Sequence, residues 1–328
     1  MLNLFLIAAS SLVFFSIYIK KELIAKKLGL ADLPDKKLKT HKKNTPVIGG
    51  IVFGILAILI LGFFIYTKDI ILIKILLLSL ICGIIGIIDD IYKIKANTKL
   101  FFLTLIFLIF FNLFPELRIK HIIFSEDFFV QNLNFENKHI LSIAVTILCY
   151  QLLIHAFNMA DGHDGIAALM AITWLAYIYF VKTNFQFLVP IIATLLLFIY
   201  FNLKSKIFLG DSGNYFLSTL LGSLIILNNN LHKNFLVEEI FILLMLPGID
   251  MLRLFLTRIK NNQNPIVGDR KHLHHFLFNK FNKSNTTLVY FLLFIIPIFF
   301  LYFKILSENY IIVFFLLIYI AIISKFRK

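Results

Sequence analysis

The sequence contains little cysteine and little charge. Cys82 and Cys149 are the only two cysteines among 328 residues, and both lie inside apolar segments without the spacing of metal ligands. This argues against a disulfide framework and against a reactive thiol, so we expect both side chains to serve in packing. Charged residues make up only 15% of the chain, while hydrophobic residues make up 60% and the mean hydropathy is +0.90. Such a composition excludes an ordinary soluble globular protein.

Long apolar runs occupy most of the chain. About 17 to 25 apolar residues are needed to cross roughly 30 Å of hydrocarbon as a helix, whose backbone groups are satisfied within the segment. The sequence therefore predicts an all-α polytopic membrane protein with about eleven transmembrane helices, or ten if one short run does not cross. No soluble domain interrupts them, so we expect a single integral membrane domain over residues 1–328. The runs lie near residues 2–19, 46–66, 70–88, 100–114, 140–157, 166–181, 184–201, 212–228, 235–252, 288–304 and 309–324.

Basic residues are unevenly distributed along this topology. Lys20 and Lys21 directly follow the first run, and neither a basic region before it nor a small-residue cleavage pattern is present, which indicates a retained span. With the N-terminus outside, eleven spans place 24 of the 32 Lys and Arg residues on the interior side, as the positive-inside rule expects. The C-terminus is then cytoplasmic. The net charge of +14 reflects this bias and an attraction to anionic lipids or substrates, so no nucleic-acid partner is expected.

Six acidic residues stand at the ends of apolar segments. An ionised carboxylate beside a membrane span is costly unless it binds a partner, so these positions are functional candidates. All six fall in segments that the topology places on the interior side, although several spans separate them in sequence. They are Asp89, Asp90, Asp161, Asp164, Asp211 and Asp269.

Asp89 and Asp90 are adjacent in the segment GIIDDIYKIK. Two neighbouring carboxylates repel each other, and one pKa rises unless a cation or strong donors compensate. A divalent cation would compensate, and Mg²⁺ prefers one or two carboxylates together with water and phosphate oxygens. The pair therefore predicts a sparse Mg²⁺ site that serves a phosphate substrate. The alternative is that both residues merely cap the helix end or pair with Lys93 and Lys95.

The segment FNMADGHDGIA places Asp161 and Asp164 around Gly162 and Gly165. Glycines in such a turn let backbone amides approach a ligand, while both carboxylates stay on one short loop. Asn158 adds an amide that can donate and accept. The alternative is a structural turn in which Asp164 caps the following helix.

The segment KIFLGDSGN leads into an apolar run whose N-terminus favours phosphate. Asp211 is well placed there as a metal ligand, with helix capping as its alternative. Phe208 could stack on a nucleotide base. In a chain with 38 phenylalanines, however, packing in the core or against lipid is the commoner role.

Three imidazoles, His272, His274 and His275, follow Asp269 and Arg270 in GDRKHLHHF. Zinc is disfavoured because adjacent histidines in a short segment do not easily converge on one tetrahedral ion, and no cysteine accompanies them. We favour a cationic, donor-rich strip for a diphosphate or a sugar, in which Arg makes bidentate contacts and His donates. A solvated loop is the alternative.

Taken together, these segments resemble the polyprenyl-phosphate N-acetylhexosamine-1-phosphate transferases, glycosyltransferase family 4. The resemblance runs in the family's order from NTPVIGG at residues 44–50 through GIIDD, NMADGHDG and FLGDSG to DRKHLHH. Each motif alone is weak evidence, whereas five in order on one predicted membrane face are strong evidence. The DRxHxHH form resembles the undecaprenyl-phosphate GlcNAc-1-phosphate transferase branch.

The resemblance implies a Mg²⁺-dependent phosphoglycosyl transferase. Such an enzyme moves a HexNAc 1-phosphate, here expected to be GlcNAc 1-phosphate, from a UDP-sugar to undecaprenyl phosphate and releases UMP. This is the first membrane step of cell-surface glycans such as O-antigen lipopolysaccharide or teichoic acid. Within the family, the alternative is the phospho-MurNAc-pentapeptide transferase of peptidoglycan synthesis. Outside it, the alternative is an ion-coupled transporter, which the one-sided acids and the lack of a repeat disfavour.

The resemblance also implies roles for individual residues. Asp89 and Asp90 match the family's catalytic Asp-Asp pair, and Asp211 together with Asp90 matches its Mg²⁺ ligands. Three places depart from the family pattern: His163 replaces an apolar residue of the DGxDG turn, Lys93 replaces a third acid, and the basic loop LPDKKLKTHKK has Leu38 at the position of an arginine. Substrate contacts are implied at Lys99, Asn158, Asp161, Asp164, Phe208, Asp269, Arg270, His272, His274 and His275.

A location and partners follow from the same resemblance. We expect a multi-pass protein of the inner (plasma) membrane, with catalytic loops and an active site that face the cytoplasm. The expected partners are the UDP-sugar, undecaprenyl phosphate, the lipid bilayer and, as in the translocase branch, a second copy of the chain in a homodimer.

Overall fold

The structure is a computed structural model that describes residues 2–32, 44–125, 132–183, 185–264 and 271–326. Within these ranges the chain forms thirteen α-helices, one 3-10 turn, one π-helical segment and four two-residue strands. The all-α class predicted from the sequence is therefore confirmed. Two predicted site residues, Asp269 and Arg270, lie outside the described residues.

The chain forms two compact units, and each is assembled from two separate segments. The first unit comprises Met1–Phe110 and Ala167–Leu224. Helices α5 and α9 begin in it and end in the second unit, and α7 begins one residue ahead of its second segment. Its elements are α1 (Leu2–Ile19), α2 (Lys21–Leu28), β1 (Ala31–Asp32), β2 (Thr45–Pro46), α3 (Gly49–Thr67), α4 (Ile70–Tyr92), α5 (Ala96–Leu113), α7 (Ile166–Tyr177), the π-helical η2 (Ile178–Lys182), α8 (Leu188–Asn202) and α9 (Gly210–His232).

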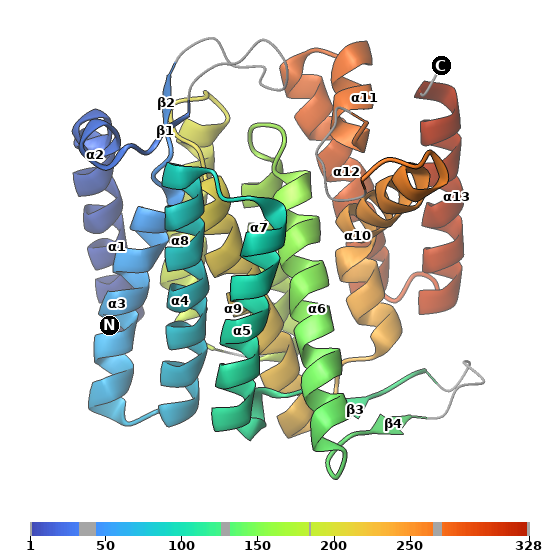
Figure 1. Ribbon diagram of the computed structural model, residues 1–328, viewed down its shortest axis with the longest axis horizontal. Coiled ribbons are helices and arrows are strands. Elements are labelled where there is room, and N and C mark those ends of the chain that lie inside the picture. Colours follow the sequence, from blue (N-terminus) through green and yellow to red (C-terminus); the bar gives the residue numbers. More distant parts are fainter. Residues whose placement is uncertain (1, 33–43, 126–131, 184, 265–270, 327–328) are drawn as a thin grey trace. The chain divides into compact units, whose positions relative to one another are not determined.

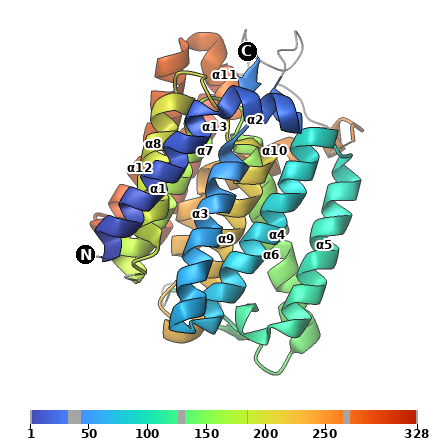
Figure 2. The ribbon, with the colours of Figure 1, turned by 90° about the vertical axis from the view of Figure 1, so that its left-hand side faces the viewer.

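Apolar faces hold the first unit together. Helix α1 packs on α8 and α3, and α3 packs on α4, as Figure 2 shows for the blue and cyan ribbons. The fully buried Phe53 of α3 stacks on Phe216 of α9, with ring centroids 6.3 Å apart. Strands β1 and β2 pair antiparallel, with Ala31 opposite Pro46. Large aromatic side chains thus fill the spaces between the helices. Inside a membrane this close packing, and not the exclusion of water, holds helices together.

The second unit comprises Phe111–Ile166 and Ile225–Lys328. Its helix α10 contacts α6, α12 and α13, and α11 packs on α12 and α13. Figure 1 draws α6 in green and the other four helices in orange to red. Strands β3 and β4 pair antiparallel, with His121 opposite Asn134. Its elements are η1 (Pro115–Leu117), β3 (His121–Ile122), β4 (Leu133–Asn134), α6 (His139–Ala160), α10 (Val237–Lys260), α11 (Leu273–Lys280), α12 (Lys283–Tyr302) and α13 (Glu308–Phe326).

Every apolar run predicted from the sequence coincides with a helix. By length and composition, seven helices in the described ranges are able to cross a membrane, or eight if the bent pair α1 and α2 counts as one span. Helices α7 and α8 are shorter, and α9 carries Ser and Asn side chains along its length. The chain is a multi-pass membrane protein, whereas the number eleven and the orientation stay predictions, as does the single domain over residues 1–328.

The two cysteines differ in their surroundings. Cys82 is fully buried in α4, while Cys149 lies exposed on α6, and both are free thiols. The expectation that neither forms a disulfide is confirmed. The expectation that both side chains serve in packing is confirmed for Cys82 and stays a prediction for Cys149, which lies on the outer face of α6.

Candidate functional site

In the first unit, Asp90 joins the end of α4 to the start of α9. Its Oδ1 accepts a hydrogen bond from the N–H of Asp211 at 3.0 Å, and its Oδ2 accepts one from the N–H of Ser212 at 3.1 Å. The first amides of a helix have no partner inside that helix, so Asp90 acts as an N-cap supplied by a neighbouring helix. The side chain is buried, and both of its oxygens are engaged in this way.

Glycines allow the two helices to approach so closely. Gly210 has a φ of +74°, and a Cβ there would lie 2.6 Å from Oδ2 of Asp90. Gly86, one turn before the acidic pair, lies against α9, where a Cβ would come within 2.6 Å of the carbonyl carbon of Asp211. Neither position has room for a side chain. The glycines of GIIGIIDD and FLGDSG therefore serve to bring Asp90 onto the first amides of α9.

Lys99, in the first turn of α5, links Asp89 and Asp211. Its Nζ forms ion pairs with Oδ2 of Asp89 and with Oδ2 of Asp211, the latter at 3.2 Å. The other oxygen of Asp89 accepts a hydrogen bond from the N–H of Ile94 at 2.9 Å. The side chain of Asp89 is only 2% exposed, whereas those of Asp211 and Lys99 are 25% and 20% exposed. Two carboxylate oxygens from different helices thus converge on one partly accessible cation.

The donor set around Lys99 fits a sparse Mg²⁺ site. Oδ2 of Asp89 is buried against the ammonium group of Lys99, and Oδ2 of Asp211 lies against the same group. In the described part of the chain, no three His, Cys, Asp or Glu side chains form a closed metal cluster. Two carboxylates suit a cation that completes its shell with phosphate oxygens and water. Asp89 is better placed for this than Asp90, whose oxygens cap α9.

Phe208 connects two of the sequence motifs through its backbone. Its N–H donates to the carbonyl of Pro46 at 2.9 Å, and its carbonyl accepts from the N–H groups of Ile48 and Gly49, both at 3.2 Å. These bonds attach the segment TPVIGG to the segment FLGDSG, just before Asp211. The ring of Phe208 is half-buried, so its predicted role as a base-stacking residue stays a prediction.

In the second unit, the turn that joins α6 to α7 is tied to the start of α12. The carboxylate of Asp164 forms an ion pair with Lys283, and its carbonyl accepts a hydrogen bond from Oγ1 of Thr287 at 3.0 Å. His163 Nε2 donates to the carbonyl of Lys283 at 3.1 Å, which fixes the proton on that nitrogen because a carbonyl only accepts. Burial lowers the pKa of His163, so the ring is neutral here. Asp161 ends α6, and its N–H bonds back to that helix.

The departure at His163 has a structural explanation. Its ring is buried against Phe278 of α11, with centroids 5.3 Å apart, as an apolar residue at this position would be. Its polar edge meets a backbone carbonyl instead of solvent. The imidazole thus combines the packing of an apolar side chain with one hydrogen bond.

The predicted histidines form a cluster at the start of α11. The rings of His272 and His274 are stacked with centroids 5.5 Å apart, and those of His274 and His275 lie 4.2 Å apart. His274 is 2% exposed, and its Nε2 lies so close to Gly162 that a Cβ there would overlap the ring. The turn at residues 161–165 therefore packs directly on α11. Burial, and then the neighbouring imidazoles, hold the pKa of His274 well below 6.5, so it is neutral.

Sequence reasoning missed a carboxylate beneath this cluster. Asp250, in α10, accepts hydrogen bonds from Tyr319, Arg253 and His272, and from the N–H of Leu273. Asp250 lies near the end of the apolar run at 235–252, and the six candidate acids were likewise chosen because they lie at the ends of apolar runs. It was overlooked because no recognisable motif surrounds it. The sequence also gives no sign that Tyr319 of α13, which lies 69 residues further along the chain, is a partner of Asp250.

Comparison with known proteins finds a family model that matches the middle of the chain. Residues 72–229, the segment that carries Asp89, Asp90, Lys99 and Asp211, match the family model of glycosyl transferase family 4. Over this segment the chain is similar to that family. The four residues that converge in the first unit therefore all lie in the matched segment.

Three relatives match this chain over most of its length. A probable undecaprenyl-phosphate N-acetylglucosaminyl 1-phosphate transferase of Bacillus subtilis is 29% identical over 84% of this chain and 77% of that protein. A phospho-N-acetylmuramoyl-pentapeptide-transferase of Clostridium beijerinckii is 29% identical over 72% and 76%. An undecaprenyl-phosphate alpha-N-acetylglucosaminyl 1-phosphate transferase of Escherichia coli O157:H7 is 25% identical over 77% and 70%. These relatives lend the ion-coupled transporter no support.

Proposed function

We propose that this protein transfers GlcNAc 1-phosphate from UDP-GlcNAc to undecaprenyl phosphate and releases UMP. The convergence of Asp89 and Asp211 on Lys99, at the ends of α4, α9 and α5, carries the proposal. Two of the relatives are named for the transfer of N-acetylglucosaminyl 1-phosphate to undecaprenyl phosphate, which supports it.

The proposed reaction exchanges one phosphorus–oxygen bond for another. An oxygen of the lipid phosphate bonds to the β-phosphorus of the UDP-sugar, while the bond from that phosphorus to the bridging oxygen breaks and UMP departs. A phosphate monoester is already largely ionised near neutral pH, with a second pKa of about 6 in phosphorylated side chains, so a general base is not obligatory. Bound Mg²⁺ would neutralise charge on the diphosphate oxygens.

The residues of the first unit divide this work between them. Asp89 and Asp211 would hold the cation, and Lys99 would neutralise phosphate charge next to them. Asp90 positions Asp211 by capping α9, so its proposed role as a metal ligand passes to Asp89. Asp211 also stands at the N-terminus of α9, where the helix dipole favours phosphate.

The second unit would supply contacts to the nucleotide and the sugar. The turn with Asn158, Asp161 and Asp164 and the helix with His274 and His275 are packed on one another, and this packing supports a shared binding surface. We further propose that the site faces the cytoplasm at the inner membrane. The homodimer stays a prediction.

The proposal is tested by UMP release from purified protein in detergent. The substrates are undecaprenyl phosphate and a panel of UDP-sugars that includes UDP-GlcNAc, UDP-GalNAc and UDP-MurNAc-pentapeptide, each with Mg²⁺ and with EDTA. We expect release with UDP-GlcNAc that EDTA abolishes. Asp211→Asn should lower kcat by about 100-fold or more, because a charge that stabilises the transition state is lost. UMP release from none of the sugars would refute the proposal.

A matched control is available in α4. Asp69 caps the N-terminus of that helix through Leu72, at the other end from Asp89 and Asp90. Asparagine caps a helix about as well as aspartate, so Asp69→Asn removes one charge and keeps the structure. Activity close to that of the unmodified protein is expected.

A second candidate is the transfer of phospho-MurNAc-pentapeptide. The relative from Clostridium beijerinckii, which is named for that reaction, favours it. The same panel separates the two, because a protein that uses UDP-MurNAc-pentapeptide and not UDP-GlcNAc would replace the GlcNAc assignment while retaining the reaction class.

A further inference from the structure

A buried carboxylate lies at the centre of a polar network in the second unit. Asp250 of α10 is 5% exposed, and four donors surround it. Oδ1 accepts from Oη of Tyr319 at 2.7 Å and from Nη2 of Arg253 at 2.8 Å. Oδ2 accepts from Nδ1 of His272 and from the N–H of Leu273, both at 3.1 Å. A buried carboxylate is costly unless it is paired in this way.

Two further bonds close the network. Nε of Arg253 donates to Oη of Tyr319 at 2.7 Å, so the tyrosine accepts from the arginine and donates to the acid. Nη2 of Arg253 also donates to the carbonyl of Lys271 at 2.5 Å. Asp250 and Arg253 of α10 thus hold residues 271–273, where α11 begins, and Tyr319 of α13 supports both of these α10 side chains.

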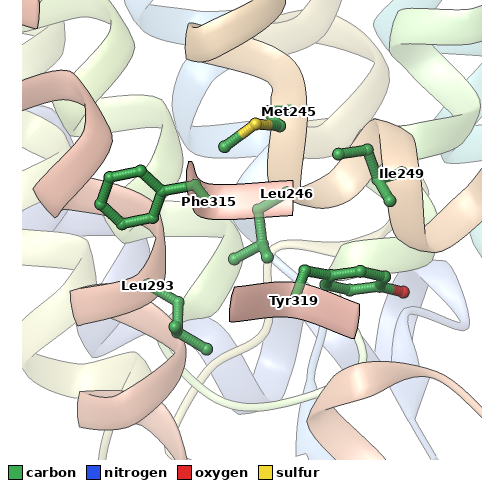
Figure 3. Close-up of a pocket in the computed structure, with 6 residues that line it drawn as sticks. All are labelled: Met245, Leu246, Ile249, Leu293, Phe315 and Tyr319. Atoms are coloured by element: carbon green, nitrogen blue, oxygen red, sulfur yellow. The ribbon is translucent and has the colours of Figure 1, made fainter. Parts of the chain in front are cut away.

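The ring of Tyr319 is anchored by apolar contacts. It lines a small apolar pocket whose side chains come from α10, α12 and α13, and Figure 3 shows its hydroxyl on the side away from Leu293 and Phe315. A tyrosine held by its ring and by its hydroxyl has little freedom to move. It therefore serves as a rigid donor for Asp250.

The network controls the orientation of the histidine cluster. A carboxylate that accepts from Nδ1 of His272 keeps that nitrogen protonated and directs Nε2 to the opposite edge of the ring. The ring of His272 is stacked on that of His274, with planes 6° apart. The orientation of the His272 ring therefore restricts the orientation of the His274 ring. The N–H of Leu273 is held by the same carboxylate, which fixes the first residue of α11.

We propose that Asp250 is a positioning residue for sugar-nucleotide binding, which acts through His272 with Arg253 and Tyr319 as its supports. The inference rests on the proposed function and adds to it a residue that orients the contacts to the sugar nucleotide. Asp250 reaches the substrate only through the imidazoles on α11. Its loss therefore weakens binding of the UDP-sugar and leaves the reaction centre around Lys99 intact.

The test is a kinetic comparison of Asp250→Asn, His272→Gln and the double variant. Asparagine has one acceptor oxygen in place of two, so its NH₂ group must face either Nδ1 of His272 or the donors Tyr319 and Arg253, and either choice breaks bonds of the network. We expect KM for the UDP-sugar to rise roughly tenfold, the low end of the loss when the carboxylate behind a metal-bound histidine is removed. We expect kcat and KM for undecaprenyl phosphate to stay within about twofold. In the His272→Gln background, Asp250→Asn should add little, because its effect passes through that histidine.

Two conservative variants, Tyr319→Phe and its control Tyr310→Phe, keep the inference testable if Asp250→Asn does not fold. Tyr319→Phe removes one donor and keeps the ring in its pocket, so we expect a smaller rise in the same KM. Tyr310→Phe, on the same helix with Tyr310 71% exposed, should change nothing. A KM unchanged in both Asp250→Asn and Tyr319→Phe, equal losses in kcat, or full additivity with His272→Gln would each overturn the inference. Inactivity of the unmodified protein toward every UDP-sugar would instead refute the proposed function.

Discussion

Adjacent carboxylates in the pair Asp89 and Asp90 have different partners. Successive residues on a helix point about 100° apart, so the two side chains leave α4 in different directions. Asp90 meets the backbone amides of Asp211 and Ser212, whereas Asp89 meets Lys99. The charge repulsion that makes such a pair costly is relieved by helix amides on one residue and by an ammonium group on the other.

This division predicts different phenotypes for the two residues. Asp89→Asn should lower kcat strongly with little effect on stability, because the residue faces the proposed cation. Asp90→Ala should lower the free energy of unfolding by about 1 kcal/mol, as the loss of a helix cap does. Asp90→Asn keeps one acceptor and should retain more activity than Asp89→Asn. Thermal unfolding and UMP release of the three variants check this, and equal kinetic losses in both Asn variants would contradict it.

The neutral imidazole of His274 predicts a pH dependence of stability. Its pKa in the folded protein lies well below 6.5, the value near which it titrates in the unfolded chain. Between these two values the unfolded chain binds a proton that the folded protein does not, so stability falls as pH falls below about 6.5. His163, whose pKa is also lowered by burial, acts in the same direction.

Melting temperatures measured from pH 7.5 to 5.0 test this prediction. The fall in melting temperature over that range should be shallower in His274→Gln than in the unmodified protein, since one of the two titrating rings is gone. Identical slopes would show that His274 is not the group responsible.

At the scale of the elements, contact between α4 and α9 depends on the absence of side chains. Gly86 on α4 faces the first residues of α9, and Gly50 on α3 faces Ser212 on the same turn. The motif glycines are therefore packing residues first, and the carboxylates reach their partners because the helices touch. The same holds in the second unit, where Gly162 leaves room for the ring of His274.

We predict that Gly86→Ala displaces the start of α9. The added methyl group overlaps backbone, which cannot move as a side chain can, and overpacking of this kind costs about 1 to 3 kcal/mol. Activity should fall at least tenfold as Asp211 shifts. Gly54→Ala on α3 is the matched control, because a Cβ there meets nothing within 4 Å. It should be neutral or slightly stabilising, since alanine is the better helix former. UMP release and melting temperature of both variants give the answer.

At the scale of the whole molecule, the unsettled quantity is the number of spans. The apolar runs predict five crossings between residues 137 and 262, whereas only α6 and α10 in that interval pass the length and composition test for a span. An odd number places the two residues on opposite sides of the membrane, and an even number places them on the same side. Helices α7, α8 and α9 decide between the two.

Cysteine labelling distinguishes these topologies. Asn137 and Asn262 are exposed, so Asn137→Cys and Asn262→Cys are accessible to a thiol reagent in a background without Cys82 and Cys149. We expect a membrane-impermeant maleimide on intact cells to label position 137 and to label position 262 only after the membrane is opened. Labelling of both positions in intact cells, or of neither, would contradict the eleven-span topology.

The sequence by itself determined the class of the protein, the position of each long helix and the motifs of its family, because hydrophobicity, charge bias and motif order are local properties of a chain. Only the tertiary structure decided that Asp90 caps α9, that Asp89 and Asp211 share Lys99, and that Asp250 supports His272. These contacts join residues far apart in sequence, and they depend on helix rotation and close packing. Neither property leaves a trace in the composition of a single segment.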